Sequence, residues 1–127
     1  MYKKILAGVI GMALISILFA ACNIVDASTL ATGPQVKMGG STFLVPSITI
    51  KKGQTLTLVD TSSAAHIIAN GSWQGGTAKH AQEASAPTIN INFAGSDTHS
   101  TPPFATAGTY KIYCTIHSGM NLTVIVQ

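Results

Sequence analysis

Short runs in which apolar and polar residues alternate follow one another from Ser41 to the end of the chain. A period of two places successive side chains on opposite faces of a β-strand, and no long run here has the period of a helix. Turn residues such as Lys51-Lys52-Gly53 separate the runs. We therefore predict an all-β fold, a β-sandwich over residues 41–127. The apolar positions expected to share its core-facing sides are Ile48, Ile50, Leu56, Leu58, Ile89, Ile91, Phe93, Tyr110, Ile112, Cys114, Leu122, Val124 and Val126.

Three segments lack this alternation. Residues 70–87 contain several Gly and are predicted to be irregular, with one helical turn around residues 78–84. Residues 95–103 are predicted to form a loop that ends at Pro102-Pro103. Residues 22–40 are rich in small and polar side chains, which is typical of a flexible tether, although a first strand around Gln35–Met38 is compatible with the pattern.

The N-terminus has the pattern of an export signal. Lys3 and Lys4 precede the uncharged run 5–21, which is short for a membrane span and contains two Gly. The sequence Leu18-Phe19-Ala20-Ala21-Cys22 resembles the lipobox of bacterial lipoproteins, although Phe19 stands where Leu is commoner. The resemblance implies that residues 1–21 are removed and that Cys22 carries lipid. We expect a protein anchored to the cell membrane and facing outside the cytoplasm, at the cell surface or in the periplasm. Ordinary cleavage near Ala21 is the alternative.

Charge and cysteine content exclude several classes of protein. All basic residues are Lys, and no basic cluster follows the signal, so we expect no nucleic-acid partner. Without residues 1–21 the chain keeps five Lys and four acidic residues, a net charge of 5 − 4 = +1. Two Cys residues cannot provide a disulfide framework. We expect a monomer in which long-range electrostatic steering is weak.

The chemistry is concentrated between the last two predicted strands. Cys114, His117 and Met120 are spaced C-x2-H-x2-M, which places a thiolate, an imidazole and a thioether in one short loop. Soft sulfur ligands select copper, and two His, one Cys and a weak axial Met form blue-copper electron-transfer sites. His66, in an apolar stretch after a predicted strand, supplies the second imidazole.

Residues 107–126, with this ligand spacing, and the upstream His66 resemble the plastocyanin-like cupredoxins, with a short ligand loop closer to that of amicyanin. The resemblance implies a Greek-key β-sandwich and one type 1 copper bound by His66, Cys114, His117 and Met120. It also implies that redox proteins dock near His117, where Ile116 and Gly119 form an apolar rim. Two departures stand out. Ile116 replaces a frequent Pro, and Ile67 replaces an Asn that braces the ligand loop, so that this brace must come from elsewhere or be missing.

The resulting hypothesis is a one-electron carrier that is not an enzyme. The alternatives are a copper-scavenging or copper-delivery protein and a metal-free adhesive sandwich, and the lack of additional Met or His clusters favours the carrier. His80 and His99 lie in polar sequence and are expected to be solvated rather than to form a second metal site. For Trp73 the interpretation is core packing or, alternatively, a place at the copper end or near a partner surface.

Overall fold

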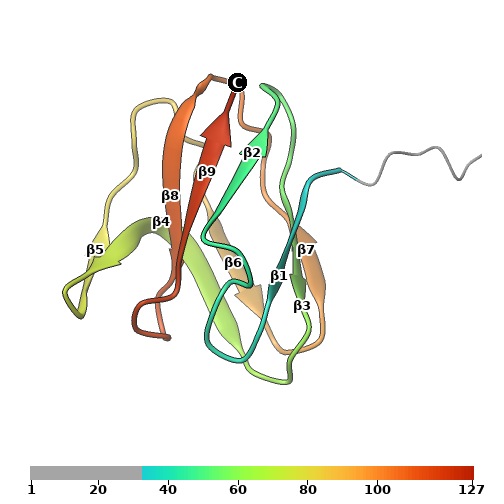
Figure 1. The fold of residues 1–127 in the computed structure, drawn as a ribbon, viewed down its shortest axis with the longest axis vertical. Helices are drawn as coiled ribbons and strands as arrows, with labels where there is room; N and C mark the ends of the chain where they lie inside the picture. The colour runs from blue at the N-terminus through green and yellow to red at the C-terminus, as the bar shows by residue number, and fades with distance from the viewer. Residues whose placement is uncertain (1–32) are drawn as a thin grey trace, which may run out of the picture. The chain divides into compact units, whose positions relative to one another are not determined.

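The computed structural model describes residues 33–127, which form nine strands and no helix (Figure 1). No helix in this part of the chain has the length and hydrophobicity that crossing a membrane requires. The strands are β1 (Gln35–Met38), β2 (Ser47–Ile50), β3 (Thr57–Asp60), β4 (His66–Gln74), β5 (Thr77–His80), β6 (Asn90–Phe93), β7 (Thr98–Ser100), β8 (Gly108–Cys114) and β9 (Asn121–Val126).

The strands form two sheets. The smaller has the order β1-β3-β7, in which β1 runs parallel to β3 and β7 antiparallel to it. The larger has the order β2-β9-β8-β4-β5, and β6 also pairs with β4. β2 runs parallel to β9, while β9, β8 and β4 are antiparallel neighbours. The predicted β-sandwich is therefore confirmed.

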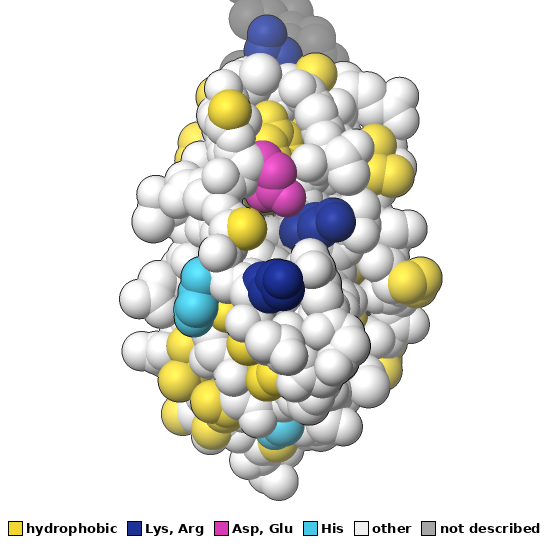
Figure 2. All heavy atoms as spheres, turned by 90° about the vertical axis from the view of Figure 1, so that its left-hand side faces the viewer, with side chains coloured by type: hydrophobic (Ala, Val, Ile, Leu, Met, Phe, Trp, Pro, Cys, Tyr) yellow, Lys and Arg dark blue, Asp and Glu magenta, His cyan; other side chains and the backbone are white. Residues whose placement is uncertain are grey.

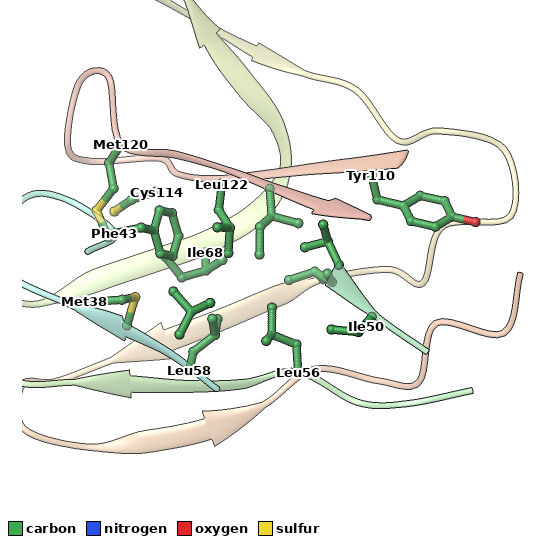
Figure 3. Packing of buried hydrophobic residues seen from close by; sticks show 14 of the residues in the cluster. Met38, Phe43, Ile50, Leu56, Leu58, Ile68, Tyr110, Cys114, Met120 and Leu122 are labelled. Atoms are coloured by element: carbon green, nitrogen blue, oxygen red, sulfur yellow. The ribbon is translucent and has the colours of Figure 1, made fainter. Parts of the chain in front are cut away.

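The core lies between the two sheets, as the alternation predicted (Figure 3). Leu56 and Leu58 are fully buried before and within β3, and Ile112 and Cys114 are fully buried in β8. Burying an aliphatic side chain of this size contributes about 1.5–3 kcal/mol relative to leaving it exposed. Other buried members of the cluster are Val36, Met38, Phe43, Ile50, Ile68, Ile89, Phe93, Phe104, Tyr110, Met120, Leu122, Val124 and Val126.

The structure corrects two predictions about irregular segments. The helical turn expected around residues 78–84 is wrong, because the Gly75-Gly76 turn folds residues 77–80 back as β5 against the end of β4. The loop expected at residues 95–103 contains β7, whose residues 98–100 pair with β3. The backbone hydrogen bonds of β5 are made with the bent end of β4, and those of β7 with the distant strand β3. The local sequence indicates neither pairing.

The first strand lies inside the segment 22–40, at the place compatible with the pattern. Val36 and Met38 of β1 are buried in the core, and the register pairs these residues with Leu58 and Asp60 of β3. The folded domain therefore includes residues 35–40.

Candidate metal centre

Cys114 is the last residue of β8 and lies in the interior. It shares a strand face with Tyr110 and Ile112, and the register places it opposite Ile68 of β4. Its side chain is fully buried, and its backbone N–H donates to the carbonyl of Met120 at 3.0 Å. A sulfur atom is thereby held at one end of the sandwich by two neighbouring strands.

The ligand loop, residues 115–120, turns the chain back from β8 into β9. Gly119 has φ +78°, a left-handed conformation that Gly adopts without steric cost. The N–H of Met120 donates to the carbonyl of His117 at 3.2 Å, which closes the loop. Met120 is buried, and its side chain points toward the Cys114 sulfur (Figure 3).

His66 reaches the same point from β4, the strand next to β8 in the large sheet. It is the first residue of β4, lies opposite Phe93 of β6 and is fully buried. Its Nδ1 lies 3.2 Å from Nδ1 of His117, which in turn lies 3.4 Å from Sγ of Cys114. The donor atoms of the three residues all lie within 4.8 Å of one another. Residues 51 positions apart therefore form one cluster, as the sequence predicted.

A buried carboxylate lies behind His66. Oδ1 of Asp60 is 3.7 Å from Nε2 of His66, and neither side chain is exposed. Oδ1 also accepts hydrogen bonds from the backbone N–H and the hydroxyl of Ser62, at 2.9 and 2.8 Å. Burial lowers the pKa of His66 below its ordinary value of 6.5, an effect that the Asp60 charge opposes and the nearby His117 reinforces. Burial therefore favours the neutral form of the His66 imidazole.

This donor set fits a type 1 copper. Two imidazole nitrogens and one thiol sulfur converge in a pocket where two of the three side chains are fully buried. Within residues 33–127, Nε2 of His66 and Oδ2 of Asp60 are buried without a hydrogen-bond partner, which fits an imidazole held between a metal and a carboxylate. His66, Cys114 and His117 would hold the ion.

The brace that Ile67 cannot provide through its side chain is supplied by other groups. The carbonyl of Ile67 accepts a hydrogen bond from the N–H of Thr115 at 2.8 Å. The indole N–H of Trp73 donates to the carbonyl of Cys114, also at 2.8 Å. Trp73 is half-buried, and its bond to Cys114 places it at the copper end, one of the alternatives to core packing considered for it from the sequence.

The remaining predicted site residues occupy the surface around the loop. His117 is half-buried, Ile116 is 51% exposed and Gly119 is exposed. Cys22 lies outside the described residues.

His80 and His99 stand apart from the cluster. His80 is exposed and shares a hydrogen bond with the hydroxyl of Tyr113, with ring nitrogens 3.0 and 3.1 Å from the oxygen. His99 pairs with Asp97 at 3.1 Å and packs edge-on against Phe93. Both rings thus have protein partners in addition to solvent.

Sequence reasoning missed the role of Asp60. The available signal was its position, because Asp60 continues the alternation of Leu56 and Leu58 and so belongs to the buried face of the strand. An acidic residue in phase with two core leucines indicates a carboxylate with a buried partner.

Comparisons with known proteins agree with this site. A model of the family described as copper binding proteins, plastocyanin/azurin family, matches residues 31–127. Amicyanin from Paracoccus versutus (Thiobacillus versutus) is 25% identical over 76% of this chain and 83% of that chain, with a TM-score of 0.59. A reduced Cu(I) form of an amicyanin mutant at pH 4 is 21% identical over 76% and 83%, with a TM-score of 0.58. A reduced form of another amicyanin mutant is 22% identical over 79% and 88%, also at 0.58. A comparison with curated protein sequences gives no match.

Proposed function

Because the chain belongs to the plastocyanin/azurin family of copper-binding proteins, we propose that it carries single electrons between redox proteins outside the cytoplasm. The observation that carries the proposal is the convergence of His66, Cys114 and His117 at one end of the sandwich. Bound copper supplies a one-electron couple, Cu(II)/Cu(I), at this position. In this proposal the thioether of Met120 would be a fourth, weak ligand.

The protein's contribution is to hold its donor atoms still. Cys114 and His66 lie within paired strands, and the ligand loop is closed by hydrogen bonds at both ends. Cu(II) and Cu(I) prefer different geometries, so a fixed compromise reduces the rearrangement that accompanies each electron transfer. The buried side chains of Cys114, His66 and Met120 also exclude water from the site.

His117 is the ligand that a docked redox partner can reach from the surface. It is the only half-buried member of the three-residue cluster, and Ile116 beside it is 51% exposed. A redox protein docking over Ile116 and Gly119 brings its own cofactor close to the imidazole edge. Figure 2 shows Lys and acidic side chains in the middle and upper part of this face and none at its lower end, where Figure 1 draws the loop between β8 and β9, so we expect contact there to depend mainly on apolar surface.

Burial argues for a carrier rather than a delivery protein. A protein that hands over its copper needs accessible ligands, whereas Cys114 and His66 are fully buried. The proposal includes no catalytic turnover.

Electron exchange and metal transfer can be measured on the same sample. NMR line broadening in mixtures of the Cu(I) and Cu(II) forms gives the electron self-exchange rate, while a metal-free acceptor protein tests copper transfer. A carrier exchanges electrons rapidly and keeps its copper. Slow self-exchange together with rapid loss of copper to the acceptor would instead favour the delivery alternative.

The proposal also places the protein on a membrane through a lipid on Cys22, with the domain facing outside the cytoplasm. Mass spectrometry of the mature protein and fractionation of the cells test this point. A diacylated Cys22 in the membrane fraction supports it, and an unmodified N-terminus downstream of Cys22 contradicts it. The Cys22→Ala variant, which lacks the acceptor thiol, serves as the control.

A further inference from the structure

Trp73 is bonded to both residues that flank the ligand loop. Its indole N–H donates to the carbonyl of Cys114 at 2.8 Å. Its backbone N–H donates to Oδ1 of Asn121 at 2.7 Å, and its backbone carbonyl accepts from Nδ2 of Asn121 at 3.1 Å. Cys114 ends β8 and Asn121 begins β9, so one residue of β4 contacts the loop where it starts and where it finishes.

A bend in β4 brings Trp73 to this position. β4 pairs with β8 only through residues 68–70, and the bend follows at Gly71, which has φ +129°. A Cβ at Gly71 would collide with the carbonyl oxygen of Lys79 and the ring of Tyr113. Beyond the bend, Trp73 lies edge-on to Tyr113 and meets Asn121, the β9 partner of Tyr113. Only Gly at position 71 therefore allows β4 to bend in this way and bring Trp73 to Asn121.

The hydrogen bond from the Trp73 indole is made to the peptide group between Cys114 and Thr115, which a second hydrogen bond also holds. The carbonyl of Cys114 and the N–H of Thr115 belong to one planar peptide group. The carbonyl accepts from Trp73, and the N–H donates to the carbonyl of Ile67, so β4 bonds both polar groups of this unit. A peptide plane fixed in this way restricts the backbone dihedrals of Cys114 and thereby the direction of its side chain.

We propose that Trp73 is a positioning residue of the copper centre, which clamps the ligand loop from outside the large sheet. It acts through Cys114 and Asn121 and does not contact the metal. Groups that orient metal ligands typically change metal affinity by 10- to 100-fold when they are removed. A purely structural role, in which Trp73 only packs against Tyr113, would affect the stability of the domain without affecting the copper site.

The test compares Trp73→Phe with Ile50→Val. Phenylalanine keeps an aromatic ring against Tyr113 but lacks the N–H that bonds Cys114. Ile50 lies in the core at the end of the sandwich away from Cys114 and Met120 (Figure 3), so its truncation lowers stability without touching the loop. Each protein is loaded with copper, and decay of its visible band is followed in excess chelator. Hydrogen exchange of the Thr115 amide is measured in the metal-free proteins.

We expect Trp73→Phe to release copper about tenfold faster than the wild type, to shift its visible band and to exchange the Thr115 amide faster. Ile50→Val should show a loss of stability with wild-type release, band position and exchange. Equal release from the two variants, with an unshifted band in Trp73→Phe, would overturn the proposal.

If Trp73→Phe does not fold, Asn121→Ala provides the same test. It breaks the two bonds to the Trp73 backbone and leaves the indole bond in place. Faster copper release from this variant supports the clamp, and wild-type release overturns it. Gln74→Ala is the matched control, because the Gln74 side chain bonds only the nearby Ser72.

Discussion

Removing the charge of Asp60 should raise the reduction potential of the copper. The carboxylate is fully buried, 3.7 Å from the nitrogen of His66 that faces away from the cluster. A negative charge at this place stabilises Cu(II) more than Cu(I), because the oxidised site carries one more positive charge. The Asp60→Asn variant keeps the shape of the side chain and an oxygen for the two bonds from Ser62, while it removes the charge.

The magnitude of the change follows from Coulomb's law. With the carboxylate about 7 Å from an ion bound at Nδ1 of His66, one unit of charge contributes about 2.4 kcal/mol at an effective dielectric constant of about 20. For a one-electron couple this energy corresponds to about 100 mV. Because both groups are buried, the shift should differ little between low and high salt.

Protein-film voltammetry at pH 7 and two ionic strengths measures this potential. Asp97→Asn is the control, because the Asp97 side chain is 32% exposed and its charge is screened by solvent. We expect a rise of the order of 100 mV for Asp60→Asn and a much smaller change, reduced by salt, for Asp97→Asn. An unchanged or lower potential in Asp60→Asn, with the copper spectrum retained, would refute the electrostatic reasoning.

Four further predictions concern the ligands and the other histidines. Cys114→Ser should abolish the intense visible band of the Cu(II) protein, since that band requires the thiolate; a retained band would mean a different ligand. Met120→Leu should keep copper and raise the potential in voltammetry, because Cu(II) loses a donor; complete loss of copper contradicts an axial role. Changing both His80 and His99 to Ala should leave one copper per chain and the same absorption spectrum. The metal-free protein should lose stability below pH 6.5, because the unfolded chain protonates His66 while burial lowers the pKa of His66 in the folded state. The free energy of unfolding should fall by up to about 1.4 kcal/mol per pH unit. A free energy of unfolding that stays constant between pH 7.5 and 5.5 contradicts this prediction.

Local sequence determined most of the strands, though not β5 or β7, and most of the ligand cluster. The period of two assigns each side chain to a face, and burial of Ile112, Cys114 and Leu122 followed from it because one side of the large sheet packs against the small sheet. Cys114 and His117 were identifiable because their chemistry is concentrated within one short loop. His66 was a candidate because it lies in an apolar stretch after a predicted strand, and the family resemblance supported this choice, since its partners lie 48 and 51 residues further along the chain, at positions 114 and 117.

Tertiary structure decided what covers the second face of the large sheet. Alternation places Tyr113 with the exposed Thr109 and Lys111, yet Tyr113 is fully buried. It is buried because β4 bends at Gly71 and brings Trp73 and His80 against its ring, at centroid distances of 6.2 and 5.5 Å.

Tertiary structure also decided which groups surround the ligands. Asp60 reaches His66, and Trp73 reaches Cys114, across contacts between different strands. A residue's face can be read from its neighbours in the chain, because the strand repeat is local. Which residue packs against this face depends on strand pairing and on the bend in β4, and these exist only in the folded chain.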